Sequence, residues 1–567
     1  MNKKIAFAVT AVAFVAISAS PPATYSVLIS GGTIYDGSGG TPYVGDVALK
    51  GDKIVYVGPH APGRAARTVD AAGKAVSPGF INMLSWSNES LIADGRGLGE
   101  TAQGVTLEVM GEGNSMGPLN PEMKRLALKR QDDIRFPITW TTLGQYLEFM
   151  QRKGITPNIA SFVGATTVRQ HELGERDIDP TPAQLKRMRA LVRQAMQEGA
   201  MGVGSSLIYA PATFAETPEL IALTTEAGKC GGMYISHMRD EGPKLLESID
   251  ELVEISAKSG APAEIYHFKQ AGQRNWGKLD AAIARVEAAR AAGHRITADM
   301  YTYPASSTGF DAAFPTWMQD GGIEAWVARL KDPAQRAKAL AEMRSDKVTE
   351  NGELVVKQPD KVILVGFKTA RLKPLAGKTL GEVARERGKS PEETAADLIV
   401  EDGTRIQVVY FSMSEDNVRR EVGLPWMSFG SDAASMSASG VFLKSSTHPR
   451  AYGNTARLLG KYVRDDKAAQ LPDVIRRLTS LPATNLSIKQ RGWLKPGYYA
   501  DVVVFDPATI RDNATFAKPH QLATGVKDVF VNGVQVWRDG KHTGAKPGRF
   551  VRGPGWTGWP GGGACRR

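Results

Sequence analysis

Two histidines and one aspartate stand at the ends of apolar, strand-like runs in this sequence. His237 ends the run MYISH, His267 ends EIYH, and Asp432 ends WMSFGSD. In a barrel of parallel strands the carboxyl ends of the strands converge on one mouth, so these three side chains would meet there. Neutral imidazoles bind Zn²⁺, and a carboxylate can accept a proton from metal-bound water. A single histidine at a strand end is more often a hydrogen-bonded core residue, but three such groups together favour a metal site.

The middle of the chain, about residues 75–494, shows the alternation of strand-like and helix-like segments that such a barrel requires. Apolar runs such as NIASFVGA, GGMYISHM and RITADMYTY alternate with amphipathic stretches such as AQLKRMRALVRQAMQEGA. About eight such units over some 400 residues predict an α/β fold, namely a (β/α)8 barrel of the TIM type. Two charged helices at about residues 314–361 break the alternation. We expect an insertion near the barrel mouth there.

Both ends of the chain have a different texture. Residues 24–74 and 495–550 alternate apolar and polar positions between Gly-rich turns, as in YSVLISGGTIYDGSG and VKDVFVNGVQVWRDGK. This pattern predicts short antiparallel strands, and we expect the two ends to pair in one small β-domain. Residues 551–567 are rich in Gly, Pro and Trp, which predicts an irregular tail.

The first 20 residues are typical of a signal peptide. Lys3 and Lys4 precede the apolar run 5–17, and residues 18–20 are small enough for cleavage. The run is shorter than the about 20 residues that span a bilayer, although a retained anchor is the alternative. We therefore expect an exported protein, periplasmic or secreted, without stable membrane insertion after the signal is removed.

The composition narrows the class of partner. The chain has 567 residues, 42% of them hydrophobic, and a formal net charge of +11. Its Lys and Arg residues are interleaved with acids, and no basic stripe with aromatics occurs, so a nucleic-acid partner is not expected. We expect a small-molecule substrate, and nothing in the pattern indicates an oligomeric state. An oxidising compartment would permit a bridge between Cys230 and Cys565, but two distant cysteines do not make a disulfide framework, and we expect Cys230 to be a buried small hydrophobe instead.

The sequence segments around the candidate residues resemble those of the D-aminoacylase (N-acyl-D-amino-acid deacylase) family of the amidohydrolase superfamily. The similar segments cover nearly the whole mature chain in order: GGTIYDGSG, SPGFIN, QGVTLEVMGEG, SSLIYAPATFAE, ISHMRDEG, HFKQAG, ADMYTYPASST, FGSDAAS, HPRAYG, LKPGYYADVVVFDP and ATFAKPHQLATGVKDVFVNG. The resemblance implies a (β/α)8 barrel beside a small β-sandwich formed by both termini. It also implies deacylation of N-acyl-D-amino acids.

The resemblance assigns a role to each matching residue. His237 and His267 match the two histidine ligands of a tightly held zinc ion, and Asp432 matches the general base and acid. Three positions match the groups that hold the substrate's α-carboxylate: Lys269, Tyr301 and Ser307. An ammonium and two hydroxyls form a compact set of donors for a carboxylate. Arg239, two residues beyond a ligand, could assist or contact the acyl group.

Two departures from the family pattern concern the metal. Leu84 and Trp86 stand where family members carry a His-x-His pair, so a second, weaker metal site is expected to be absent or rebuilt. Gly113 stands where the third zinc ligand is usually a Cys. Glu112 is beside it and is the natural replacement, because a carboxylate oxygen binds Zn²⁺ at nearly the same distance as nitrogen. The alternative for Glu112 is a turn carboxylate that bonds to nearby amides.

These residues predict a mechanism with one Zn²⁺ per chain, or another divalent metal. The metal would activate water, and Asp432 would accept its proton and return it to the departing amine. Trp86 and Leu84 could shape an acyl pocket, and His448 could contact substrate or act as a structural cap. Two alternatives stay open: a related amidohydrolase acting on cyclic amides or dipeptides, and a catalytically silent exported binding protein.

Overall fold

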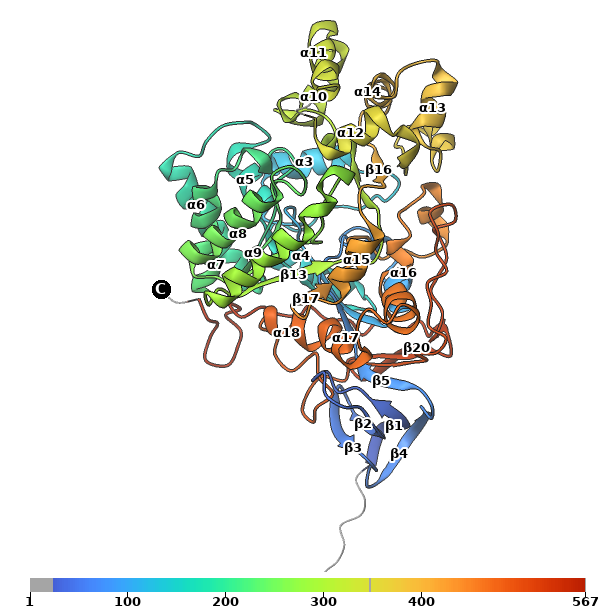
Figure 1. The fold of residues 1–567 in the computed structure, drawn as a ribbon. Coiled ribbons are helices and arrows are strands. Elements are labelled where there is room, and N and C mark those ends of the chain that lie inside the picture. Colours follow the sequence, from blue (N-terminus) through green and yellow to red (C-terminus); the bar gives the residue numbers. More distant parts are fainter. Residues whose placement is uncertain (1–23, 346–347, 566–567) are drawn as a thin grey trace, which may run out of the picture.

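A barrel of parallel strands occupies the middle of the molecule (Figure 1). The computed structural model describes residues 24–345 and 348–565, so the predicted signal peptide, residues 1–20, lies outside the described residues. Six barrel strands pair in the order β17-β13-β12-β11-β10-β9 and three in the order β6-β7-β8. Their bounds are β6 (Phe80–Asn82), β7 (Val105–Met110), β8 (Asn158–Ser161), β9 (Val163–Gly164), β10 (Gly202–Ser206), β11 (Met233–His237), β12 (Ala263–Ile265), β13 (Ile296–Met300) and β17 (Met427–Phe429).

Backbone hydrogen bonds close the barrel between its first and last strands. The N–H of Met83 donates to the carbonyl of Phe429 at 3.1 Å, and the N–H of Asp432 donates to the carbonyl of Leu84 at 2.9 Å. Strand β8 continues into β9 through Phe162, so the nine barrel strands of the described chain fill the eight positions of a (β/α)8 barrel. The predicted fold class is confirmed.

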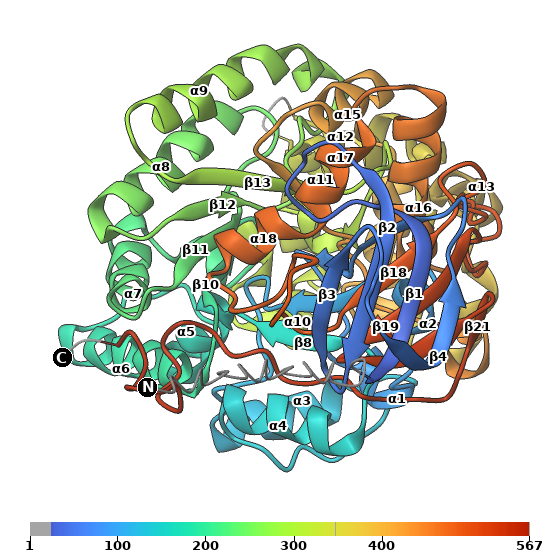
Figure 2. The same cartoon turned by 90° about the horizontal axis from the view of Figure 1, so that it is seen from below.

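Helices cover the outside of the barrel (Figure 2). The sequence predicts helix α6 (Pro182–Glu198) well, because a capping box at Thr181 starts it and Gly199, with φ of 114°, ends it. The other barrel helices include α4 (Leu143–Lys153), α5 (Ala165–Leu173), α7 (Thr217–Lys229), α8 (Leu245–Ser259), α9 (Leu279–Ala291), α15 (Glu415–Val422), α16 (Arg450–Arg457) and α17 (Leu471–Leu478). Within residues 24–345 and 348–565, no helix combines the length and apolar character needed to cross a membrane.

Strands from both ends of the chain form one hydrogen-bonded sheet below the barrel (Figure 1). Strand β5 joins the two ends, since it pairs with β1 on one side and with β18 on the other. The strands are β1 (Thr24–Ile34), β2 (Tyr43–Lys50), β3 (Lys53–Gly58), β4 (Arg64–Asp70), β5 (Ala75–Pro78), β18 (Val502–Phe505), β19 (Val526–Val531), β20 (Val534–Arg538) and β21 (Lys541–His542). The sheet has its own apolar core, which includes Ile29, Val47 and Phe530.

An insertion with a separate apolar core lies on the opposite side of the barrel from this sheet (Figure 1). It extends beyond the predicted residues 314–361, because its strands pair antiparallel in the order β14-β16-β15 across residues 306–410. Its elements are β14 (Ser306–Gly309), α10 (Gly322–Lys331), α11 (Pro333–Met343), α12 (Glu350–Lys357), β15 (Val362–Leu364), α13 (Leu380–Arg387), α14 (Pro391–Asp402) and β16 (Gln407–Tyr410). Residues 362–410 also alternate strands and helices, so their sequence pattern resembles that of the barrel.

The expectation that Cys230 is an unpaired hydrophobe is wrong. Cys230 is fully buried at the end of α7 and forms a disulfide with Cys565, 335 residues further along. The C-terminal tail brings Cys565 there by folding back on the barrel helices, and the N–H of Thr557 donates to the carbonyl of Gln197 at 3.1 Å. Such a contact between distant segments has no signature in cysteine spacing.

The disulfide predicts a stability effect. Replacing Cys565 by Ala frees the tail and enlarges the unfolded ensemble, so we expect the free energy of unfolding to fall by about 2–4 kcal/mol. Urea unfolding followed by circular dichroism would measure this, with reduced wild-type protein as the reference. Two titratable thiols in the native, unreduced protein, with no change in stability on substitution, would contradict the bond.

Candidate metal centre and active site

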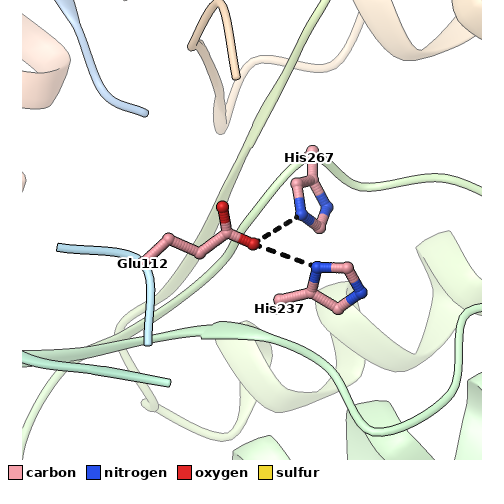
Figure 3. A group of neighbouring side chains, drawn as sticks. All are labelled: Glu112, His237 and His267. Atoms are coloured by element: carbon pink, nitrogen blue, oxygen red, sulfur yellow. Dashed lines mark hydrogen bonds and ion pairs between the residues drawn. The ribbon is translucent and has the colours of Figure 1, made fainter. Parts of the chain in front are cut away.

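Glu112, His237 and His267 converge at the carboxyl ends of three barrel strands (Figure 3). Glu112 follows β7, His237 ends β11, and His267 follows β12. Oε1 of Glu112 lies 3.0 Å from Nδ1 of His237 and 3.2 Å from Nε2 of His267. All three side chains are buried. The sequence prediction that Glu112 joins the two histidines therefore matches the geometry of the site.

The turn after β7 explains why Glu112 takes this place. Gly111 and Gly113 both have positive φ, 107° and 64°. A Cβ at Gly113 would lie 2.4 Å from Cβ of Ser206, so no larger residue fits there. The two glycines turn the intervening Glu112 side chain toward the histidines, and no side chain at position 113 is available as a ligand.

This donor set fits a divalent metal ion. Ligand atoms about 2.0 Å from a tetrahedral Zn²⁺ lie about 3.3 Å from one another, close to the two distances from Glu112. Burial raises the pKa of Glu112, but the hydrogen bonds from His237 and His267 outweigh it, and the net pKa is lowered. Glu112 is therefore an anion, the form in which a carboxylate binds a metal.

Glu241 lies behind both histidines, and the sequence reasoning missed it as a functional residue. Its Oε1 is 3.0 Å from Nδ1 of His267, and its Oε2 is 3.6 Å from Nε2 of His237. Nζ of Lys269 donates to the same Oε1 at 2.6 Å and to the carbonyl of His267 at 2.9 Å. Burial raises the pKa of Glu241, but the positive charge of Lys269 and the two histidines lower it by more. The net pKa is below the usual value, so the carboxylate is charged. A carboxylate behind a ligating histidine fixes its tautomer and ring orientation.

Asp432 faces the same group of side chains from the last strand. Nε1 of Trp86 donates to Oδ1 of Asp432 at 3.1 Å and to Oε2 of Glu112 at 2.9 Å. Burial raises the pKa of Asp432 above its usual value, and the nearby Arg450 opposes this only in part. Asp432 and His267 both have positive φ, 48° and 36°, which is uncommon for residues other than glycine. Backbone strain of this kind gathers at functional sites.

Arg450 is a second residue that the sequence reasoning did not single out. Its Nη1 lies 2.8 Å from Oδ2 of Asp432, and its guanidinium lies 4.4 Å from the centre of the Tyr301 ring. The neighbouring His448 has both ring nitrogens engaged by backbone, since Nδ1 accepts from the N–H of Arg450 and Nε2 is 3.0 Å from the carbonyl of Ala305. The buried His448 thus acts as a support for the loop that carries Arg450. A signal was present, because the HPRAYG motif contains both residues.

The remaining predicted residues differ in how they face the site. Lys269, Tyr301 and Ser307 line the central cavity. Nζ of Lys269 already donates to Glu241 and to the carbonyl of His267, and Oγ of Ser307 donates to the carbonyl of Val408. Arg239 is not among the lining residues. Its guanidinium pairs with Glu251 and donates to two backbone carbonyls, so the structure places it as a support rather than at the substrate.

The cavity above these groups has a volume of about 450 Å³, in the range of small-molecule sites. One wall comes from the insertion, and its lining side chains there are Ser306, Ser307, Thr308, Asn351, Val365, Arg405 and Gln407. Trp86 also lines the cavity. Leu84 does not reach the cavity, because it packs in the apolar layer inside the barrel, so the expectation that it shapes an acyl pocket is wrong.

Comparisons with known proteins agree with this geometry. Residues 423–537 match the model of a family described as amidohydrolase family. A D-aminoacylase of Alcaligenes xylosoxydans xylosoxydans is 31% identical, over 94% of this chain and 99% of the relative. A solved D-aminoacylase structure, described with a binuclear metal centre in which one metal activates and the second attenuates, has a TM-score of 0.76 at 29% identity and covers 93% of this chain and 100% of its own. An N-acyl-D-glutamate deacylase from Bordetella bronchiseptica, solved with zinc and a phosphonate mimic of the tetrahedral intermediate, has a TM-score of 0.76 at 26% identity, over 94% and 100% of the two chains.

The position of Glu241 predicts an effect on metal affinity. Glu241→Gln keeps the shape but loses the charge that lies 3.0 Å from Nδ1 of His267 and 3.6 Å from Nε2 of His237, so we expect zinc affinity to fall about 10- to 100-fold. Competition with a chromophoric chelator measures this without any substrate. Glu251→Gln is the matched control, since Glu251, like Glu241, is paired with a basic side chain, in its case Arg239, but lies away from the cavity. Equal zinc affinity in the two variants would refute the role of Glu241.

Proposed function

Since this chain belongs to the D-aminoacylase family of amidohydrolases, we propose that it removes the acyl group from N-acyl-D-amino acids. The observation that carries the proposal is the convergence of Glu112, His237, His267 and Asp432 in one cavity of small-molecule size. The D-configuration of the substrate rests on the names of the relatives.

We assign Glu112, His237 and His267 as the groups that hold one Zn²⁺ per chain. Imidazole and carboxylate ligands suit zinc but also accept other divalent ions. When bound, such an ion supplies Lewis acidity that activates water and polarises the amide carbonyl. The zinc in the N-acyl-D-glutamate deacylase supports this choice of metal.

Asp432 carries the proton transfers. Its carboxylate accepts a proton as the water oxygen bonds to the amide carbon. It then gives that proton to the amide nitrogen as the C–N bond breaks, because an amine leaves only when protonated. A raised pKa brings Asp432 closer to the working pH, which favours both accepting and returning the proton. The products are a carboxylate and a free amino acid.

Substrate recognition uses the cationic and hydroxyl groups beside Asp432. We assign Tyr301 and Ser307, with the positive charges of Lys269 and Arg450, to the α-carboxylate of the substrate. The Ser307 hydroxyl then turns from the carbonyl of Val408 to donate to the carboxylate. Among the residues that the structure describes, the hydroxyl of Tyr301 donates only to the sulfur of Met413, at 3.3 Å, so it is available to a better acceptor. Because the N–H groups of Lys269 face Glu241 and His267, this residue acts mainly through its charge.

Comparing N-acetyl-D-amino acids with their L-forms tests the proposed function. We expect the zinc-loaded protein to release amino acid from the D-forms, Asp432→Asn to lower kcat about 10²- to 10⁴-fold, and His267→Ala to lose zinc and activity together. Glu251→Gln is the control for handling and folding. Equal or greater turnover of the L-forms would overturn D-specificity, while release from a cyclic amide or a dipeptide alone would replace the substrate class.

We further propose that the protein is exported through cleavage of residues 1–20. The charged and apolar pattern of that segment supports export, and so does the Cys230–Cys565 disulfide, since disulfides persist in oxidising compartments. Fractionation of producing cells, followed by N-terminal sequencing, should find a shortened chain outside the cytoplasm. A full-length chain that begins at Met1 in the cytoplasm would contradict export.

A further inference from the structure

One indole N–H connects the general base to the metal-ligand carboxylate. Nε1 of Trp86 is 2.9 Å from Oε2 of Glu112 and 3.1 Å from Oδ1 of Asp432. The other oxygens of these carboxylates have different partners, because Oε1 of Glu112 faces the two histidines and Oδ2 of Asp432 faces Arg450. Oε2 of Glu112 and Oδ1 of Asp432 therefore share one neutral donor, the indole N–H of Trp86.

The fold holds the Trp86 ring in this place. Its backbone N–H donates to the carbonyl of Ala433 at 3.0 Å, and the preceding Ser85 forms a parallel bridge with the same residue. The Oγ of Ser85 donates to Glu108 at 2.7 Å inside the barrel. Trp86 thus sits on the seam where the first and last barrel strands meet, one residue from Ser85 and close to Asp432.

Trp86 brings two negatively charged carboxylates, those of Glu112 and Asp432, to the same N–H donor. The carboxylate of Glu112 is buried and that of Asp432 is only 12% exposed, so their negative charges repel each other with little screening by solvent. Pairs of buried carboxylates are also the oxygen ligands that a divalent ion prefers. A small polar residue at position 86 would leave room for such an ion between Glu112 and Asp432, whereas the indole ring fills the space and supplies a donor.

We propose that Trp86 is a positioning residue that stands in for a second cation. Its N–H fixes the position of the Asp432 carboxylate relative to that of Glu112, and its ring keeps a second metal ion from binding between them. The site therefore works with one metal ion. This inference rests on the proposed deacylase function for its kinetic part and on metal binding alone for its other part.

Two substitutions at Trp86 separate these parts. Trp86→Phe keeps an aromatic ring but removes the N–H, so Asp432 loses a charge-assisted hydrogen bond. We expect kcat to fall about 10- to 100-fold with KM changed less than about 3-fold. Trp86→His offers an imidazole beside the two carboxylates, so we expect zinc content at excess zinc to rise from one to two ions per chain by elemental analysis.

Trp276→Phe is the matched control, since the Trp276 indole also acts as a donor, to the carbonyl of Ser412 at 2.9 Å, and lies outside the central cavity. It should keep the wild-type kcat and zinc content. A wild-type kcat in Trp86→Phe, one zinc in Trp86→His, or two zinc ions in the wild type would overturn the inference. If the wild type hydrolyses no N-acyl-amino acid, the deacylase proposal fails, and the zinc contents of the wild type and Trp86→His still decide the role of Trp86.

Discussion

The site depends on one buried negative charge, the carboxylate of Glu112. A charge taken out of water costs several kcal/mol unless it is surrounded by donors or by a metal ion. Here the carboxylate faces two imidazoles through one oxygen and an indole through the other. Each of these donors comes from a different strand end, so the charge ties together parts of the barrel that are far apart in the sequence. The same requirement makes the site attractive to a cation, which compensates the charge better than neutral donors do.

The closure of the barrel sets the remaining geometry. Asp432 reaches the cluster because the segment after β17 bonds to the segment after β6, where Leu84 accepts from the N–H of Asp432. That seam also carries Trp86. The indole of Trp86 on one side of the seam and the proton-accepting Asp432 on the other are thus held by backbone hydrogen bonds rather than by flexible side chains alone. Rigid strand ends with a strained φ at His267 and Asp432 are a suitable support for such a centre.

Local patterns in the sequence predicted the barrel and the strand-end residues well. Apolar runs that end in His237, His267 and Asp432 are short-range features, and parallel strands place their ends together whatever the loops do. Glu112 was singled out by the family resemblance, because it stands beside Gly113, the position at which family members carry a Cys ligand. Glu241 was harder, because it lies in a loop and its function appears only from its distances to both histidines.

Features that depend on contacts between distant segments could not be read in this way. The Cys230–Cys565 bond joins residues 335 positions apart, and the tail that carries Cys565, residues 551–565, has no helix or strand to indicate its path. The insertion was underestimated because residues 362–410 repeat the strand–helix texture of the barrel while pairing antiparallel. Arg239 was placed near the substrate by its position two residues after a ligand. Its side chain points instead to Glu251, since a strand end fixes the direction of one residue and not of the next two.

The balance of charge around the cavity supports the proposal of a single metal ion. Three carboxylates line the metal-binding part, from Glu112, Glu241 and Asp432, against two cations, Lys269 and Arg450. The remaining lining cation, Arg405, is already paired with Asp311 at 3.0 Å. With neutral histidines, this part of the site carries one negative charge, and one divalent ion makes it singly positive. A substrate with one free carboxylate then neutralises it. A second divalent ion would leave an excess of two positive charges in a site with little water, and Trp86 supplies a neutral donor at the place where that ion would have to bind.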